Sequence, residues 1–489
     1  MKFSALALIP ITYASAFAPC TGPVVSCCKS SMALRSSSTE DNNQDNQGGL
    51  AAFWKNVEPL KEQVATGAAT AFLAASLWAS PASMVGIPEV ANTVDHYPAM
   101  SPFVSVASAK DMASATGSRV NKDPESLLRY GLPINNKEVR GLQTSIETIK
   151  QDIGSKRKSA ALDGVKKSRT TINQKASKMT ASCRDASVCT EILGKMSERL
   201  DPLETALRES SDAFQGSEQE RTALDKAYKA QDGIQKLLTT LEEQMVPAGY
   251  KTPVPEEYSD LPQLEGGRAT VEMVLKKGDG GKFRVEGKLY DKAEMKMIID
   301  GFNAPVTGGN FIDLVDKGFY NNMNIQRSDG FVVQTGDPDG PADGYVGTPS
   351  KSVGKGKHGE RLIPLEIFVV GDKGPFYEIT IEDEGRGGAA TTLPFSSYGA
   401  MGWAREEYDA NSGSSQFFWL LFDSDLTPAG KNVLDGRYPT FGYVVEGADF
   451  LGDIKEDDII VSAKVTDGIQ YLKRAEKAQP VAAPAEALE

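Results

Sequence analysis

The stretch QRSDGFVVQTGDP, residues 326–338, places a short apolar segment between two polar side chains. Arg327 precedes Phe331 and Val332, and Gln334 follows them before a Gly-Asp-Pro turn. One interpretation is a β-strand whose polar ends face water. The other is a shallow apolar pocket with two hydrogen-bonding groups at its rim, shaped to hold a peptide. These residues alone do not distinguish the two interpretations, so we compare them with the surrounding sequence.

The residues on both sides of this stretch are typical of a β-barrel. After Arg268 the apolar residues recur with a period of two, as Val271, Met273 and Leu275 do. Short strands and turns continue to about Leu472, with room for two helices. Such a series of short strands predicts a closed or nearly closed antiparallel barrel.

Amphipathic helices are predicted before the barrel. The segment DPESLLRYGLP, residues 123–133, begins with an Asp-Pro helix start and ends with Gly and Pro stop signals. A longer helix is predicted to begin at Asn135, which fits a capping box with Glu138. Apolar steps of three and four residues predict an up-and-down bundle, and their near-heptad spacing leaves open the pairing of one helix with a partner protein. The apolar faces comprise Val139, Leu142, Ile146, Ile149 and Ile153; Ile192, Met196, Leu200, Leu203 and Leu207; and Leu224, Ile234, Leu238, Leu241 and Met245.

A basic segment, SKRKSAALDGVKKSR at residues 155–169, lies within this helical region. Lysines and arginines at this density are typical of a solvated helix face. The alternative is a contact surface for an acidic partner, and the sequence leaves both open.

The first hundred residues have the features of a targeting leader. Residues 1–16 predict a secretory signal, and residues 17–60 predict a plastid transit segment whose ASAFAP junction resembles the leaders of algae with secondary plastids. Residues 61–109 contain a second apolar run that ends in small residues. This run predicts a second cleavable signal and delivery to the thylakoid lumen, and a membrane anchor is the alternative.

Charge and histidine content exclude several classes of protein. The formal net charge of −13 over 489 residues argues against general nucleic-acid binding. With only two histidines, His96 and His358, a histidine-based metal site and a Ser-His-Asp triad are both disfavoured. We therefore expect no metal and no cofactor.

Two cysteines remain outside the predicted leader, Cys183 and Cys189. Residues six apart on one straight helix point in different directions, so a disulfide between them requires a turn between two helices. The spacing alone leaves a disulfide and two unpaired thiols equally open.

The sequence predicts an α+β protein with several parts. Residues 110–246 form the helical bundle, and residues 247–266 form a Pro-rich linker whose prolines and glycines break any regular element. Residues 267–474 form the barrel, and residues 475–489 form a disordered tail.

Four motifs in order resemble the cyclophilins, a family of peptidyl-prolyl cis-trans isomerases. They are residues 304–320 (APVTGGNFIDLVDKGFY), the opening stretch, residues 411–421 (NSGSSQFFWLL) and residues 434–447 (LDGRYPTFGYVVEG). The resemblance implies an eight-stranded antiparallel barrel with two capping helices, the first of which spans residues 305–317. The helical region with the barrel is similar to the large thylakoid-lumen cyclophilins of plants, which join a helical bundle to a cyclophilin domain.

The resemblance also implies roles for individual residues. Arg327 matches the catalytic arginine, and Gln334 matches the glutamine that binds the substrate backbone. The alternatives are a structural ion pair for Arg327, a satisfied amide at a strand end for Gln334, and a place in the barrel core for Phe418 and Leu434. The matching walls of the proline pocket are Phe331, Phe418 and Leu434, and Ala404 matches the small residue beside the substrate backbone.

Four features depart from the family pattern. Val332 stands where the family has a methionine, Tyr438 replaces a histidine, and Val433 replaces a tryptophan. The step from Arg327 to Phe331 is one residue short. An insertion at residues 369–394 covers the pocket, binds a partner, or is a tolerated surface loop.

The sequence leaves three functions open. The first is an active isomerase that acts on proline-containing lumenal polypeptides, and the second is a non-catalytic binding module in which the bundle regulates or recruits. In the third, the bundle is a membrane-surface or oligomerisation element. The resemblance implies a role in assembly or maintenance of photosystem II, with weak or absent isomerase activity, and leaves peripheral association with the thylakoid open. We also expect the bundle or the linker to pack on the barrel and to limit access to the pocket.

Overall fold

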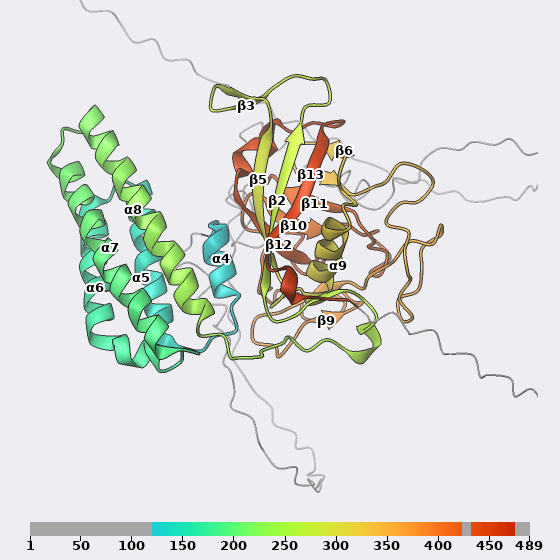
Figure 1. The fold of residues 1–489 in the computed structure, drawn as a ribbon, viewed down its shortest axis with the longest axis horizontal. Coiled ribbons are helices and arrows are strands. Elements are labelled where there is room, and N and C mark those ends of the chain that lie inside the picture. The colour runs from blue at the N-terminus through green and yellow to red at the C-terminus, as the bar shows by residue number, and fades with distance from the viewer. Residues whose placement is uncertain (1–119, 423–431, 475–489) are drawn as a thin grey trace, which may run out of the picture. The chain divides into compact units, whose positions relative to one another are not determined.

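The computed structural model describes residues 120–422 and 432–474, where a helical bundle is followed by a closed β-barrel (Figure 1). The predicted leader and the predicted tail, residues 1–109 and 475–489, lie outside the described residues. Of the helices in the described ranges, none has the length and apolar character that crossing a membrane requires. The predicted fold class, a bundle before an eight-stranded antiparallel barrel, is confirmed.

The bundle consists of four long helices that pack in chain order. Each helix contacts the next, and the last contacts the first, so their apolar faces meet in one core. Leu142, Ile146, Leu203 and Leu238 of the predicted faces are buried in it. The helices are α5 (Lys137–Gly154), α6 (Lys158–Thr180), α7 (Ala186–Asp212) and α8 (Glu218–Glu243), and a short helix, α4 (Pro124–Tyr130), precedes them.

The two predicted helix starts have different outcomes. Asp123 caps α4 as predicted, and its side chain accepts from two backbone N–H groups. The predicted cap at Asn135 is wrong by one residue, because Asn136 accepts from Glu138 N and Val139 N at 3.1 Å each. The amide of Asn136 also donates to Ser182 Oγ at 2.9 Å, so a contact beyond the end of α6 fixes this choice.

Several cations of the basic segment pair with acidic residues of the bundle. Arg157 pairs with Asp152 at 2.6 Å, and Arg169 lies 2.8 Å from Asp201. Lys158 pairs with Glu220 of α8. These pairs fit the interpretation of a solvated helix face better than a surface for an acidic partner.

Cys183 and Cys189 are joined by a disulfide bond. Cys183 lies in the turn after α6, and Cys189 lies in the first turn of α7. The chain therefore makes the turn that the bond requires, and the bonded alternative is the one in the structure.

The predicted linker is more regular than expected. It contains a 3₁₀ helix, η1 (Glu256–Tyr258), and a short strand, β1 (Gln263–Leu264), which pairs with β14 (Leu472–Lys473). Tyr258 and Leu264 are buried in the same cluster as the barrel interior. Burial of its apolar residues therefore overrides the local preference of the prolines for irregular structure.

The barrel has eight antiparallel strands in the order β10-β11-β7-β6-β13-β2-β5-β12. Its interior is filled by aromatic and aliphatic side chains such as Trp403, Phe417 and Phe441. The strands are β2 (Arg268–Lys276), β5 (Ala293–Asp300), β6 (Met323–Ser328), β7 (Val332–Thr335), β10 (Ala400–Trp403), β11 (Phe417–Leu420), β12 (Thr440–Glu446) and β13 (Ile459–Asp467).

One of the two predicted capping helices has a different form. The first is α9 (Pro305–Asp316), which buries Phe311, Leu314 and Val315 as predicted. At the second position, after β12, the chain forms the 3₁₀ helix η4 (Ala448–Asp453). Short pairs outside the barrel are β3 (Phe283–Val285) with β4 (Lys288–Tyr290), and β8 (Glu366–Ile367) with β9 (Phe376–Tyr377), and a last 3₁₀ turn is η5 (Ile469–Tyr471).

Candidate functional site

Successive residues of the barrel strands alternate between the interior and an outer layer. On β11, Phe417 and Trp419 belong to the interior cluster, whereas Phe418 belongs to a separate cluster outside it. On β7, Val333 points inward and Val332 belongs to the outer cluster. This is the period of two that a pleated strand imposes. Phe418 is therefore not part of the barrel core, which was the alternative to a role in the pocket.

Three predicted site residues form one row across adjacent strands. Arg327 on β6 pairs with Gln334 on β7, and Gln334 pairs with Phe418 on β11. The row continues to Gly402 on β10. Residues opposite each other in a sheet project from the same face with their Cβ atoms about 5 Å apart. The cation, the amide and the ring therefore share one surface.

A β-bulge turns Arg327 toward this surface. Ile325 lies in the barrel interior and pairs with Thr335, but Arg327 pairs with Gln334, so Gln326 is an extra residue in β6. Without the bulge, the strand period would direct Arg327 into the interior with Ile325.

Gln334 belongs to a chain of amides. Its Nε2 donates to Oε1 of Gln416 at 2.8 Å, and Nε2 of Gln416 donates to the carbonyl of Asp343 at 2.8 Å. The second bond fixes the orientation of both amides, because Gln416 must then present its oxygen to Gln334. Within the described part of the chain, the buried Oε1 of Gln334 has no hydrogen-bond partner.

Arg327 is bonded to a carboxylate two residues away. Its Nε lies 2.9 Å from Oδ2 of Asp329, and its Nη2 also pairs with that oxygen. Oδ1 of Asp329 accepts from the backbone N–H groups of Phe331 and Val332 at 2.9 and 3.1 Å. Burial acts to raise the pKa of Asp329, but these hydrogen bonds and the guanidinium outweigh it and hold the pKa below its ordinary value. Asp329 is therefore ionised, and the structural ion pair that was the alternative role for Arg327 is present.

The apolar residues of the predicted pocket come together in the outer cluster. Phe331 packs at its edge and stacks on Phe422 at 5.9 Å. The remaining walls are almost completely buried, which excludes contact with a proline ring unless something moves. Their exposed fractions are 0% for Val332, Phe418 and Leu434, 3% for Tyr438 and 6% for Ala404.

Residues 391–397, which we call the strap, cover this cluster. The ring of Phe395 stacks on Phe418 with centroids 5.8 Å apart and planes at 13°. Phe395 N donates to Oδ1 of Asp435 at 2.7 Å, and Tyr443 Oη donates to the Pro394 carbonyl at 2.8 Å. The strap thus lays a Leu-Pro-Phe sequence over the surface where a proline substrate is predicted to bind.

The insertion that leads into the strap also contacts the site. Ile381 N donates to the Gly436 carbonyl at 2.9 Å, and Arg437 Nε donates to Glu382 at 2.9 Å. Both bonds hold the turn that carries Leu434 and Tyr438. Of the three possibilities for residues 369–394, a cover over the pocket agrees best with these contacts.

Helix α4 closes another side of the outer cluster. Leu127 and Leu128 are buried in the same cluster as Phe418 and Val332. The Leu128 carbonyl accepts from Arg268 of β2, and Asn303 Nδ2 donates to the Gly131 carbonyl at 2.9 Å. These contacts support the expectation that part of the helical region packs on the barrel and limits access to the pocket.

Two of the family departures lie in different surroundings, one buried and one exposed. Tyr438 lies under the guanidinium of Arg405, 5.0 Å from its ring centroid, and packs edge-on against Phe418 at 6.0 Å. Burial raises the pKa of Tyr438, so its hydroxyl stays protonated. Val433 is 53% exposed and contributes little to the pocket.

Sequence reasoning missed three residues of this site. Gln416 lies two residues before Phe418 in a quoted motif, so the strand period could have placed it on the same face. Asp329 lies inside the opening stretch, but no sequence pattern assigns its carboxylate to Arg327. Phe395 has no signal in the sequence, because its partner is far along the chain.

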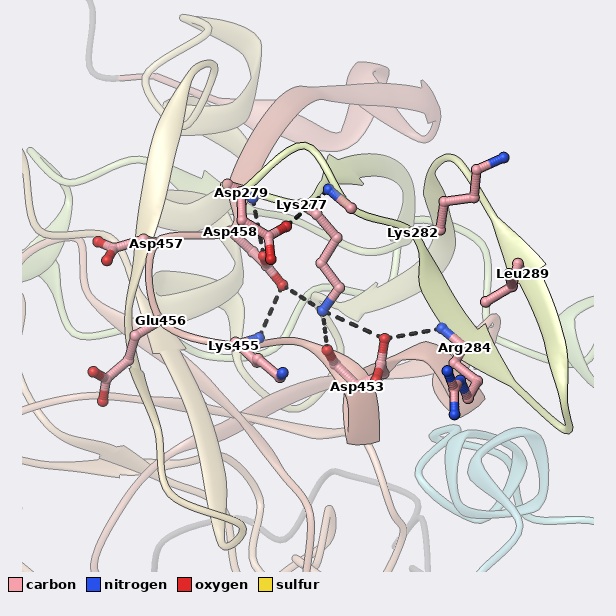
Figure 2. Close-up of a pocket in the computed structure, with 12 residues that line it drawn as sticks. Lys277, Asp279, Lys282, Arg284, Leu289, Asp453, Lys455, Glu456, Asp457 and Asp458 are labelled. Carbon is pink, nitrogen blue, oxygen red and sulfur yellow. Dashed lines mark hydrogen bonds and ion pairs between the residues drawn. The ribbon is translucent and has the colours of Figure 1, made fainter.

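A cavity of about 670 Å³ lies elsewhere, under the β3–β4 hairpin (Figure 2). None of the eight predicted site residues lines it. Lys277 points between Asp453 and Asp458 and donates to Oδ2 of Asp458 at 3.1 Å. The central charges of the cavity therefore satisfy one another. Among residues 120–422 and 432–474, no group of three or more His, Cys, Asp or Glu residues is arranged to hold a metal ion.

Comparisons with known proteins agree with both parts of the fold. The family model for cyclophilin-type peptidyl-prolyl cis-trans isomerases matches residues 285–475, and the model for the PsbQ-like domain of CYP38-like isomerases matches residues 123–246. The chain is 38% identical over 402 residues to the chloroplastic peptidyl-prolyl cis-trans isomerase CYP38 of Arabidopsis thaliana, covering 82% of this chain and 85% of that protein. It is 40% identical over 370 residues to a protein of Synechocystis sp. named "putative thylakoid lumen peptidyl-prolyl cis-trans isomerase sll0408", covering 74% of this chain and 86% of that protein. The chloroplastic isomerase CYP37 of Arabidopsis thaliana is 34% identical over 227 residues, covering 45% and 44%.

Three findings indicate the same family: the barrel topology, the row of residues across its strands, and the sequence identity over most of both chains. The chain belongs to the cyclophilin-type peptidyl-prolyl cis-trans isomerases, with a CYP38-like helical domain before its barrel.

Proposed function

We propose that this protein binds proline-containing segments of thylakoid-lumen polypeptides and isomerises their X-Pro bonds slowly. The uncatalysed barrier of about 18–20 kcal/mol comes from the partial double bond of the amide. A catalyst needs no nucleophile for this reaction. It must bury the ring, fix the flanking backbone and donate to the amide as conjugation breaks. The row of Arg327, Gln334 and Phe418 supplies these three groups on one surface and is the observation that carries the proposal.

The lumen as location is supported by the names of the relatives and by the predicted leader. The resemblance to the lumen cyclophilins of plants supports photosystem II subunits as clients and peripheral contact with the thylakoid membrane. Assistance in folding or assembly of these subunits is the role that follows from such binding.

A second candidate is a non-catalytic assembly module whose helical region restricts the pocket. The observation in its favour is the burial of the pocket walls under the strap and α4. In this case a client would contact surfaces other than the proline pocket.

A coupled proline-peptide assay on the protein from residue 110 onward tests the first candidate. We expect a small acceleration over the uncatalysed rate that Arg327→Ala abolishes. Arg157→Ala is the matched control, because Arg157 also pairs with an aspartate but lies in the bundle. If the wild type does not accelerate isomerisation, or if Arg327→Ala accelerates it as much as the wild type does, the proposed catalytic role is excluded and the assembly module remains.

A further inference from the structure

Arg327 has two acceptors within the reach of its side chain. Gln334 is its cross-strand partner, so a guanidinium at this position can extend toward the amide oxygen of Gln334. Nε and Nη2 of the guanidinium both bond to Oδ2 of Asp329. The side chain is therefore held along its own strand end rather than across the row.

Because Arg327 bonds to Asp329, the acceptor oxygen of Gln334, Oε1, is left without this donor. The bond from Gln416 to Asp343 fixes the amide chain, so Oε1 of Gln334 cannot exchange places with its Nε2. That oxygen is buried and has no partner in the described residues. A buried acceptor without a donor is unfavourable, and a nearby guanidinium is the natural donor to satisfy it.

Asp329 is held in place by the backbone. Its Oδ1 closes the turn between β6 and β7 through the N–H groups of Phe331 and Val332. Gly330, with φ +82°, allows this tight turn. The other oxygen, Oδ2, is thereby fixed beside Arg327 and acts as a preformed anchor for its guanidinium.

We propose that Asp329 is a positioning residue that holds Arg327 in a resting orientation, from which the guanidinium must turn toward Gln334 to reach a bound X-Pro amide. This inference rests on the proposed role of Arg327 in isomerisation. No covalent bond changes in the step; one charge-assisted hydrogen bond is exchanged for another. The bond to the Asp329 carboxylate thus lowers the rate of isomerisation, because it holds Arg327 away from the position in which it would act with Gln334 and Phe418.

Asp329→Asn tests the inference because the asparagine retains the oxygen that closes the turn and loses the charge that anchors Arg327. We expect kcat for a proline peptide to rise roughly tenfold with KM unchanged, since only a transition-state contact is affected. The NMR resonance of the Arg327 Nε–H group should shift in the same variant. Asp329→Ser, which also retains a turn acceptor, should give the same direction of change.

Two controls separate this inference from the proposed function. Asp279→Asn is the matched control, because Asp279 also closes a turn by accepting from Gly281 N at 2.8 Å, but it lines the cavity at the β3–β4 hairpin. The double variant Asp329→Asn with Arg327→Ala should show no gain. Unchanged or reduced kcat in Asp329→Asn, while Arg327→Ala abolishes activity, would overturn the inference and leave the proposed function intact. No effect of either substitution would remove the proposed function itself.

Discussion

Gln326 decides the direction of the residue that follows it. The bulge at Gln326 places Arg327 on the outer face, where Gln334 and Phe418 also lie. The sequence predicts the residue types of this row from the polar ends of a short apolar segment. It does not predict the bulge, because the bulge depends on the pairing of β6 with β7, a contact that a local pattern does not contain.

Gly402 sets the position of the Phe418 ring. A Cβ atom at residue 402 would lie 2.2 Å from Cζ of Phe418, so Gly402→Ala must displace the ring. We expect a loss of about 1–3 kcal/mol in the free energy of unfolding, measured by urea denaturation. Gly141→Ala is the control, because nothing lies within 4 Å of its added Cβ in α5. That variant should gain about 0.5–1 kcal/mol, and an equal effect of both substitutions would contradict the account.

At the level of elements, the strap and the earlier part of the insertion, residues 369–390, cover the predicted pocket. The extent of the insertion is predictable from its place between two family motifs. Its contacts with the turn at residues 434–438 are not, because they join segments about 50 residues apart in the chain through hydrogen bonds such as Ile381 N to the Gly436 carbonyl. The second capping helix is present as the 3₁₀ helix η4, a form that the family pattern does not specify.

The disulfide stabilises the turn between α6 and α7. Cys183 and Cys189 are separated by six positions, and a loop of this size gives about 2 kcal/mol in the chain-entropy account. We expect Cys183→Ser with Cys189→Ser to lower the free energy of unfolding by this amount in urea denaturation. Reduction of the wild type should have the same effect and should not affect the double variant further. Equal stability of the oxidised wild type and the double variant would contradict this expectation.

At the level of the whole molecule, α4 belongs to both parts of the fold. Its leucines lie in the outer cluster of the barrel, and Arg129, with no exposed surface, donates to Glu147 of α5 at 3.1 Å. The sequence predicts α4 from its cap and stop signals, but it does not predict which surface α4 covers. Packing between distant segments decides that, and helix periodicity does not encode it.

Glu242, beside this buried ion pair, makes stability depend on pH. Burial raises the pKa of Glu242 to about 7, although Arg140 and Arg129 act to lower it. The folded state therefore takes up a proton as the pH falls through 7, whereas the unfolded state does so only near 4.5. Within this window, acidification stabilises the fold by up to about 1.4 kcal/mol per pH unit.

Glu242→Gln removes this proton uptake and should remove its share of the pH dependence. Urea denaturation at pH 7.5 and 5.5 measures the effect as the difference between the wild type and the variant. Burial beside Asp343 and Asp339 raises the pKa of Asp337 to about 6 and adds a slope of the same sign in both proteins, so only the difference reports on Glu242. Equal slopes in the two proteins would contradict the prediction.

The central claim is that the strap covers a proline-binding site whose isomerase activity depends on Arg327. NMR exchange spectroscopy of an X-Pro peptide at equilibrium tests it most directly. Phe395→Ala removes the ring that stacks on Phe418, and Phe395→Val is a second variant with a smaller loss of packing. We predict that both variants exchange the peptide faster than the wild type and that adding Arg327→Ala returns the rate to the uncatalysed value. An unchanged exchange rate in both folded variants, or a faster rate that persists without Arg327, would contradict the account.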